Sequence, residues 1–115
     1  MSASAIAVVK MATKQLGIKF VWGGADPKIG FDSSGLVIYC FKQAVGMTLP
    51  HYAGDLIIMG TPVTKAKLKA ADIIFPNDHH VGIYIGSGQY IHAPHNGEVV
   101  KIDKIDKFYA ARRLL

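Results

Sequence analysis

The spacing of the apolar residues changes near Pro62, and this change constrains the fold more than any other feature of the sequence. Before Pro62, apolar residues recur every three or four positions, as on one face of a helix. After it, they fall in short runs that are rich in β-branched and aromatic residues. Helices followed by strands are typical of an α+β domain, so we expect N-terminal helices packed on a small antiparallel β-sheet.

Three helices are predicted in the first half of the chain, over residues 4–16, 33–45 and 52–59. Gly17 and Gly46 are expected to end the two longer helices, and Asp32 or Ser33 to cap the start of the second. The residues between these helices, 17–32, are rich in Gly, Pro and Asp. They are predicted to form a long loop, and such loops in compact domains are often functional.

The pattern of residues after Pro62 predicts an antiparallel meander of strands. The expected strands cover residues 72–75, 80–85, 89–92 and 98–102, with a last strand within residues 108–115. Turn residues separate the first four of these strands, at 76–78, 86–88 and 94–97.

The chain has 115 residues, and we expect a single domain over residues 1–115 that acts as a monomer. No apolar run approaches the roughly 18 residues of a membrane span, and the first residues do not resemble a secretory signal peptide. The single cysteine, Cys40, excludes an internal disulfide and a zinc site made of several thiolates, and it is expected to be a buried thiol.

The net charge of +5 has two interpretations. It is either an ordinary soluble basic surface or an attraction to an anionic polymer, such as nucleic acid or the bacterial wall. The basic residues are dispersed, and no basic helix interleaved with aromatic residues is present. Nucleic acid is therefore not expected as a partner.

His80 and His92 are expected to meet at one end of a hairpin. His80 opens one predicted strand and His92 closes the next, so an antiparallel pairing brings the two imidazoles within reach of each other. The pair is either two satisfied polar residues at a sheet end, part of a metal site, or a general base with an orienting partner. A metal site would need further ligands, which the sequence spacing does not supply.

The segment from Gly30 to Leu36 joins the long loop to the second predicted helix. Asp32, Ser33 and Ser34 in this segment form either a plain helix cap or the site of a nucleophile. The free N–H groups at a helix N-terminus favour both a thiolate and a developing oxyanion.

Four motifs, taken together and in order, resemble the NlpC/p60 family of bacterial cell-wall cysteine peptidases, which have a papain-like fold. They are GIKFVWGG at 17–24, FDSSGLV at 31–37, HVGIYIG at 80–86 and YIHAP at 90–94. Supporting segments at 49–50, 68–75 and 111–114 extend the resemblance over about residues 5–115.

The resemblance implies a role for each motif residue. Ser33 stands where the family has its nucleophilic cysteine, His80 is the general base, and His92 orients His80. Asp32 and Ser34 are implied to hold the free amino end of a peptidoglycan stem peptide. The implied reaction is hydrolysis of the amide bond between γ-D-glutamate and the diamino acid, and no metal or organic cofactor is implied.

Two positions depart from the family pattern. A serine hydroxyl at position 33 does not ionise near neutral pH as a thiol does, so little or no turnover is expected. Ser33 is either an engineered replacement or a natural variant, and the alternatives to a disabled peptidase are a non-catalytic wall-peptide-binding module and a Ser–His hydrolase. Phe20 stands where the family usually has Tyr, which removes a hydroxyl near the nucleophile.

Two further side chains are candidates for the substrate cleft. Trp22 is either a packing aromatic beneath the loop or a wall of the cleft, and His51 is a candidate to line it. Action at the bacterial cell wall is implied, after secretion, export to the periplasm or delivery by a phage or secretion system. An inhibitor or immunity protein is a candidate partner.

Overall fold

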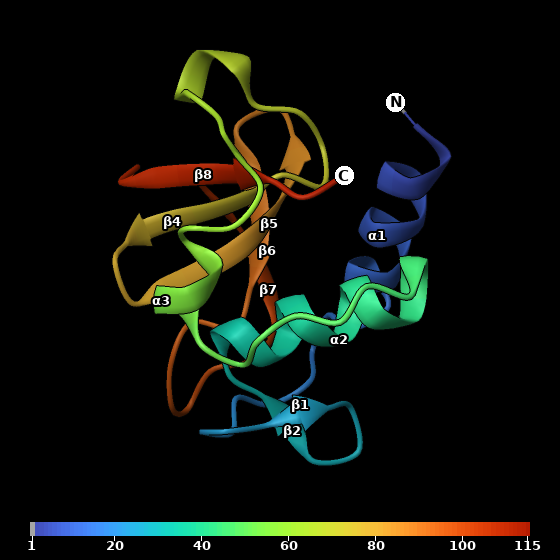
Figure 1. The fold of residues 1–115 in the computed structure, drawn as a ribbon. Coiled ribbons are helices and arrows are strands. Elements are labelled where there is room, and N and C mark those ends of the chain that lie inside the picture. The colour runs from blue at the N-terminus through green and yellow to red at the C-terminus, as the bar shows by residue number, and fades with distance from the viewer. Residues whose placement is uncertain (1) are drawn as a thin grey trace.

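The structure is a computed structural model that describes residues 2–115, and it has the expected α+β architecture. The helices are α1 (Ala3–Thr13), α2 (Ser33–Val45), the short α3 (Ala53–Leu56) and the 3-10 helix η1 (Lys65–Lys67). Helices α1 and α2 pack against each other and against the sheet that follows (Figure 1).

Six strands form one antiparallel sheet in the order β3-β8-β4-β5-β6-β7. They are β3 (Thr61–Pro62), β4 (Ile73–Asn77), β5 (His80–Gly86), β6 (Gln89–His92), β7 (Lys101–Lys104) and β8 (Ala110–Arg113). Strands β4 to β7 form the predicted meander. The sheet is not a simple meander, however, because the C-terminal strand β8 lies between β3 and β4.

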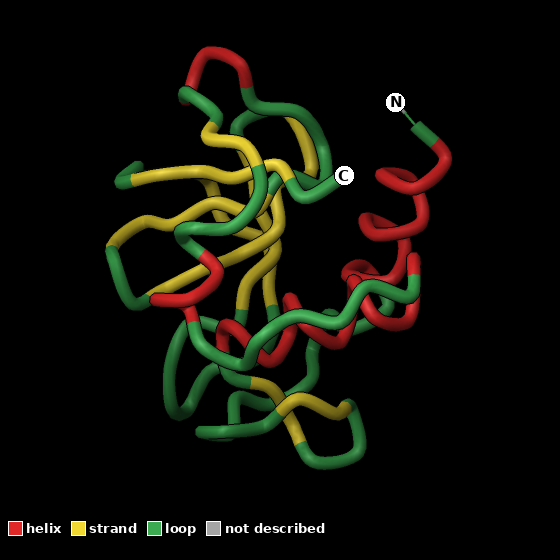
Figure 2. The backbone as a smooth tube through the Cα atoms, in the orientation of Figure 1, coloured by secondary structure: helices red, strands yellow, loops and turns green. Residues whose placement is uncertain are grey.

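The predicted loop 17–32 contains a small hairpin that the sequence analysis missed. It is made of β1 (Ala25–Asp26) and β2 (Gly30–Phe31), two residues each (Figure 2). Strands this short carry too little alternation to be recognised in a sequence. Strand β3 was missed for the same reason, and the three-residue 3-10 helix η1 is too short to show a helical period.

The predicted strand 98–102 was placed too early, since β7 begins only at Lys101. The backbone just before it pairs with the loop that follows α1. Phe20 N donates to Glu98 O at 2.9 Å, and Val100 N donates to Ile18 O at 2.8 Å. The predicted helix 4–16 is likewise shortened to end at Thr13.

Helix α2 has the boundaries predicted for it because both of its ends are capped. Asp32 has extended backbone angles and accepts a hydrogen bond from Gly35 N at 2.7 Å. Gly46 ends the helix with φ of 72°, a left-handed conformation that glycine adopts without strain.

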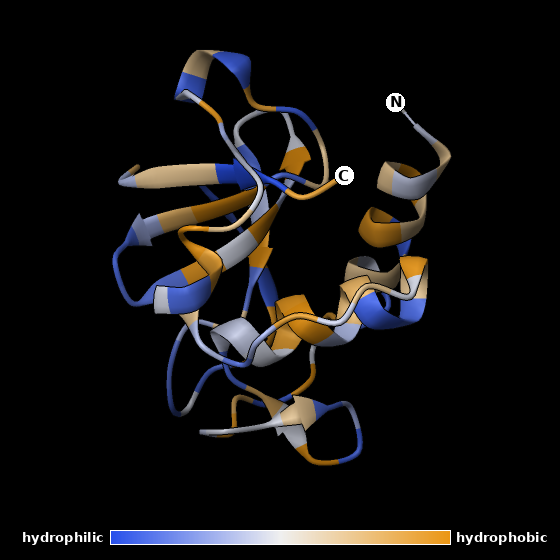
Figure 3. Ribbon diagram, viewed as in Figure 1, coloured by the Kyte–Doolittle hydropathy of each residue, from blue (hydrophilic) through white to orange (hydrophobic). Residues whose placement is uncertain are grey.

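The buried face of α2 forms the centre of the core against β5 and β6. Its members are Leu36, Val37, Cys40 and Phe41, all fully buried, and they belong to one hydrophobic cluster with Val81, Ile83 and Ile91 of the sheet. Hydrophobic residues recur along α2 and along the central strands (Figure 3). Burial of each such side chain is worth about 1.5–3 kcal/mol, so this face fixes α2 on the sheet.

The loop before α2 is held against the start of that helix by backbone contacts. Asp32 N donates to Gly24 O at 3.0 Å, and a Cβ atom at Gly35 would collide with Gly24 O. Only glycine at position 35 therefore allows the loop to approach the helix this closely.

Candidate active site

His80 and His92 are in direct contact, as the hairpin predicted. Nε2 of His80 lies 2.7 Å from Nδ1 of His92, and the two rings meet edge to face with centroids 5.0 Å apart. His80 is the first residue of β5 and His92 the last of β6. Their contact is a diagonal one across the two strands.

Gly82 makes room for this contact. Extending the register from the pair Ile83 and Ile91 places Gly82 opposite His92. A Cβ atom at Gly82 would lie 3.0 Å from the Cβ of His92 and 2.5 Å from Cδ2 of Tyr90. The absence of a side chain at position 82 therefore leaves space for His92 to reach His80.

Asp103 is a third member of this group and was missed by the sequence analysis. Its Oδ2 lies 2.6 Å from Nε2 of His92, so the order of contacts is His80, His92, Asp103. Asp103 belongs to β7, opposite Tyr90 and diagonal to His92. The predicted strand ends at residue 102, so Asp103 falls outside every predicted strand and no partner for it follows from strand pairing.

Both imidazoles are neutral near pH 7. Burial, together with the smaller effects of the nearby His92, His79 and His95, lowers the pKa of His80 to about 4. Burial also lowers the pKa of His92, and the Asp103 carboxylate opposes that effect only in part. His80 is therefore an unprotonated base in this structure.

Ser33 is the first residue of α2 and is partly buried. Its Oγ forms no hydrogen bond with any group of residues 2–115. The N-terminus of this 13-residue helix contributes positive potential and unpaired N–H groups. Helix α2 packs against β5, and the start of α2 and the start of β5 lie on the same side of the molecule in Figure 1.

Asp32 is more than a helix cap. Its Oδ1 accepts hydrogen bonds from Gly35 N and lies 2.8 Å from Nε2 of His51, and its Oδ2 accepts one from Gly23 N at 2.9 Å. Ser34 is buried, with its Oγ 3.4 Å from the same Oδ1. The carboxylate thus joins the loop, the helix and the segment that carries His51.

The two aromatic candidates occupy different environments. Trp22 is 84% exposed, so it is not a packing aromatic of the core. Phe20 is partly buried and packs against the main hydrophobic cluster. Its backbone forms an isolated β-bridge with Phe31, two residues before Ser33.

The remaining candidates lie outside this group. Cys40 is fully buried, as predicted, and burial raises the pKa of its thiol to about 12. His79 is exposed and contacts Asp78.

No set of three or more His, Cys, Asp or Glu side chains within the described chain is arranged to hold a metal ion. Across residues 2–115, no helix has the length and apolar character needed to cross a bilayer.

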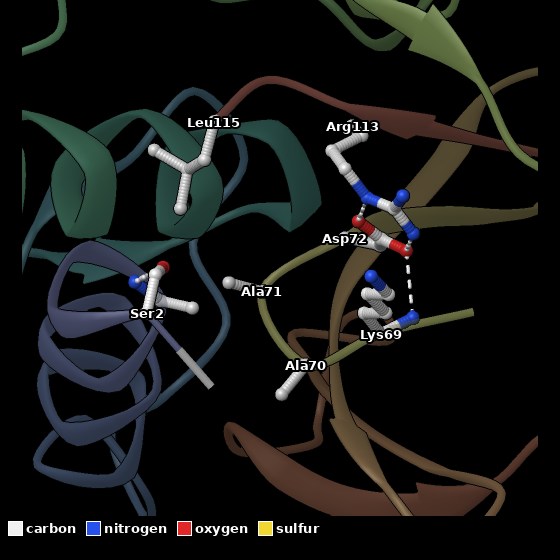
Figure 4. Close-up of a pocket in the computed structure, with 8 residues that line it drawn as sticks. Ser2, Lys69, Ala70, Ala71, Asp72, Arg113 and Leu115 are labelled. Atoms are coloured by element: carbon white, nitrogen blue, oxygen red, sulfur yellow. Dashed lines mark hydrogen bonds and ion pairs between the residues drawn. The ribbon is translucent and has the colours of Figure 1, made fainter. Parts of the chain in front are cut away.

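A cavity of about 570 Å³ lies away from the histidines, between the start of α1, the segment 69–72 that precedes β4, and the C-terminal end of the chain from Arg113 of β8 to Leu115. Figure 4 shows Ser2, Ala71 and Leu115 around the cavity. It also shows the carboxylate of Asp72 paired with the guanidinium of Arg113. The Arg113 Nε and Nη2 atoms each donate to Asp72 at 2.8 Å. None of the candidate site residues lines this cavity.

Comparison with known proteins shows which family the chain resembles in sequence and in fold. The model of the NlpC/P60 family matches residues 17–115. The probable endopeptidase YafL of Escherichia coli (strain K12) is 36% identical over 116 residues, covering 89% of this chain and 47% of YafL. The chain therefore spans about half the length of this curated relative.

Solved structures agree with this fold. The NlpC/p60 domain of the peptidoglycan hydrolase SagA superposes with a TM-score of 0.89 at 36% identity, covering 95% of this chain and 97% of that domain. RipD of Mycobacterium tuberculosis, described as a non-catalytic NlpC/p60 domain protein adapted to peptidoglycan binding, superposes with a TM-score of 0.86 at 24% identity over the full length of both chains. The second likeness concerns the fold alone.

Proposed function

The chain belongs to the NlpC/P60 family, and from this premise we propose that it is the catalytic domain of a peptidoglycan endopeptidase in which Ser33 occupies the position of the nucleophile. The observation that carries the proposal is the 2.7 Å contact between His80 and His92, which leaves Nδ1 of His80 for another partner. That partner would come from the N-terminus of α2, which packs against β5. The site of action would be the bacterial cell wall.

The proposed mechanism is nucleophilic acyl transfer with a cysteine at position 33. Its sulfur attacks the amide carbonyl carbon while His80 takes the thiol proton, and N–H groups at the start of α2 stabilise the oxyanion. The tetrahedral intermediate collapses as His80 returns the proton to the leaving amine. A water molecule then adds to the thioester, with His80 again as the base, and releases the carboxylic acid and the thiol.

The proposed substrate is a stem peptide, cut between γ-D-glutamate and the diamino acid. Asp32 and Ser34 would hold the free amino end of the stem peptide. The Asp32 carboxylate can accept a further hydrogen bond from that amino group. Oδ2 of Asp32 accepts one bond, from Gly23, whereas a carboxylate oxygen accepts two. The exposed Trp22 and the half-buried Phe20 would form walls beside the bond.

Ser33 limits this reaction. A neutral imidazole with a depressed pKa is a weak base for a hydroxyl group that is far less acidic than a thiol. We therefore infer little or no turnover by the chain with serine at position 33. The same observation favours a second candidate, a non-catalytic module that binds peptidoglycan peptides through an intact cleft.

A paired digestion tests both candidates. The native chain, Ser33→Cys and the double variant Ser33→Cys/His80→Ala are incubated with purified muropeptides, and the products are identified by mass spectrometry. The peptidase proposal expects cleavage by Ser33→Cys alone, with product masses that identify the bond. If no variant cleaves stem peptides with either lysine or diaminopimelate, while calorimetry shows that the native chain binds them, the binding module replaces it.

A further inference from the structure

We propose that Asp103 is a positioning residue that fixes the tautomers of both histidines, so that His80 presents an unprotonated Nδ1 to the residue at position 33. The proposal rests on the proposed function for the identity of that partner. The tautomers themselves follow from the contacts of three side chains.

The order of donors and acceptors starts at Asp103. A carboxylate can only accept, so Nε2 of His92, 2.6 Å away, must carry the hydrogen. A neutral imidazole has a single N–H, which makes Nδ1 of His92 an acceptor. Nε2 of His80, 2.7 Å from that atom, must then be the donor. The lone pair of His80 is therefore on Nδ1.

The histidine pair alone does not decide this order. The opposite arrangement, with Nδ1–H of His92 donating to Nε2 of His80, satisfies the same 2.7 Å contact. It would leave the hydrogen of His80 on Nδ1, where the imidazole could not accept a proton from a nucleophile. Asp103 excludes this arrangement, because it would face the carboxylate with an unprotonated Nε2 of His92.

The surroundings of Asp103 keep its carboxylate available to His92. Lys101 is the other charged group near Oδ2, at 3.8 Å, but its Nζ lies closer to Glu98, at 3.1 Å. The His92 side chain is only 6% exposed, so water does not compete for its Nε2. When His80 is protonated during the reaction, the same contacts would share the positive charge with Asp103.

Imidazole ¹⁵N NMR of the native chain tests the tautomers without any need for turnover. At pH 7 the proposal expects protonated Nε2 and unprotonated Nδ1 on both His80 and His92. Asp103→Asn should give mixed tautomers on both rings, because an amide can donate as well as accept. Asp106→Asn removes a nearby exposed carboxylate that contacts neither ring and should change nothing. A hydrogen on Nδ1 of His80 in the native chain, or unchanged tautomers in Asp103→Asn, overturns the proposal.

Kinetics of the Ser33→Cys variant give a second readout. Adding Asp103→Asn should lower kcat/KM by roughly 10- to 100-fold, mostly through kcat, since Asp103 acts through His92 and not on the substrate. Asp103→Glu keeps the carboxylate and should recover part of the loss. Equal activity of the Asn and Glu variants contradicts the proposal. If Ser33→Cys itself shows no turnover, the proposed function fails, while the NMR result still decides the tautomers.

Discussion

Oδ1 of Asp32 lies 2.8 Å from Nε2 of His51 while also accepting the backbone N–H of Gly35 at 2.7 Å. One carboxylate thus caps α2 and fixes a segment nineteen residues further along the chain. Its second oxygen holds the loop that carries Trp22, through Gly23. The position of the loop and of His51 relative to the start of α2 therefore depends on this side chain.

Replacing Asp32 should cost more stability than replacing His51. Asp32→Ala loses the helix cap and the bond to Gly23 and should lower the free energy of unfolding by about 2 kcal/mol. His51→Ala loses one partly exposed contact, worth about 1 kcal/mol or less. Urea unfolding monitored by circular dichroism measures both. Equal losses would mean that Asp32 does not act as the cap.

Ser33→Cys should give the chain one reactive thiol in addition to the inert thiol of Cys40. The introduced thiol lies at the N-terminus of α2, which stabilises a thiolate, so iodoacetamide should alkylate it well below pH 8. Cys40 is fully buried and its pKa is raised to about 12, so it should remain unmodified until the chain is unfolded.

Peptide mapping by mass spectrometry identifies the alkylated site, and the native chain, which has only Cys40, is the control. Adding His80→Ala should slow alkylation at position 33, since the proposed mechanism has the His80 imidazole assist ionisation of the thiol. Alkylation that is equally fast with and without His80 would show that the two side chains do not interact.

Stability should fall on acidification through the histidine pair. Because the pKa of His80 is lowered from 6.5 to about 4 in the folded state, the unfolded chain binds more protons between these values. Stability therefore rises with pH across this window. The His80 contribution, about 3 kcal/mol, is fully present above about pH 6.5 and is lost below about pH 4. The lowered pKa of His92 acts in the same direction.

Thermal unfolding of the native chain and of His80→Gln, compared from pH 4 to pH 7.5, measures this effect. The variant should lose less stability than the native chain as the pH falls. His79→Gln, a change at an exposed neighbour, should follow the native chain. Parallel pH profiles for the native chain and His80→Gln would refute the assignment.

Gly82→Ala should displace the side chains that pack against position 82. The new methyl group would lie 2.5 Å from Tyr90 Cδ2 and 3.0 Å from His92 Cβ, so these rings must move, at a cost of roughly 1–3 kcal/mol. Gly86→Ala is the matched control, since it has open space but a backbone φ of +99° that strains any other residue. Both variants should lose stability, but only Gly82→Ala should shift the NMR resonances of His80 and His92.

The sequence was most informative where the contacts are local. The caps of α2 are set by Asp32 and Gly46, which lie at the ends of one helix, and the structure confirms them. The contact between His80 and His92 was also predictable, because a short turn between two strands leaves few choices for which ends meet. The motifs around Ser33, His80 and His92 were sufficient to indicate the family.

The tertiary structure alone decided the contacts between elements that no short turn connects. The insertion of β8 next to β4, the approach of His51 to Asp32 and the contact of Asp103 with His92 each depend on register or packing across separate segments. A shift of one residue in β7 would turn Asp103 to the other face of the sheet. Local patterns do not contain that register, because it is fixed by the combined packing of the sheet, the loop after α1 and the core beneath them.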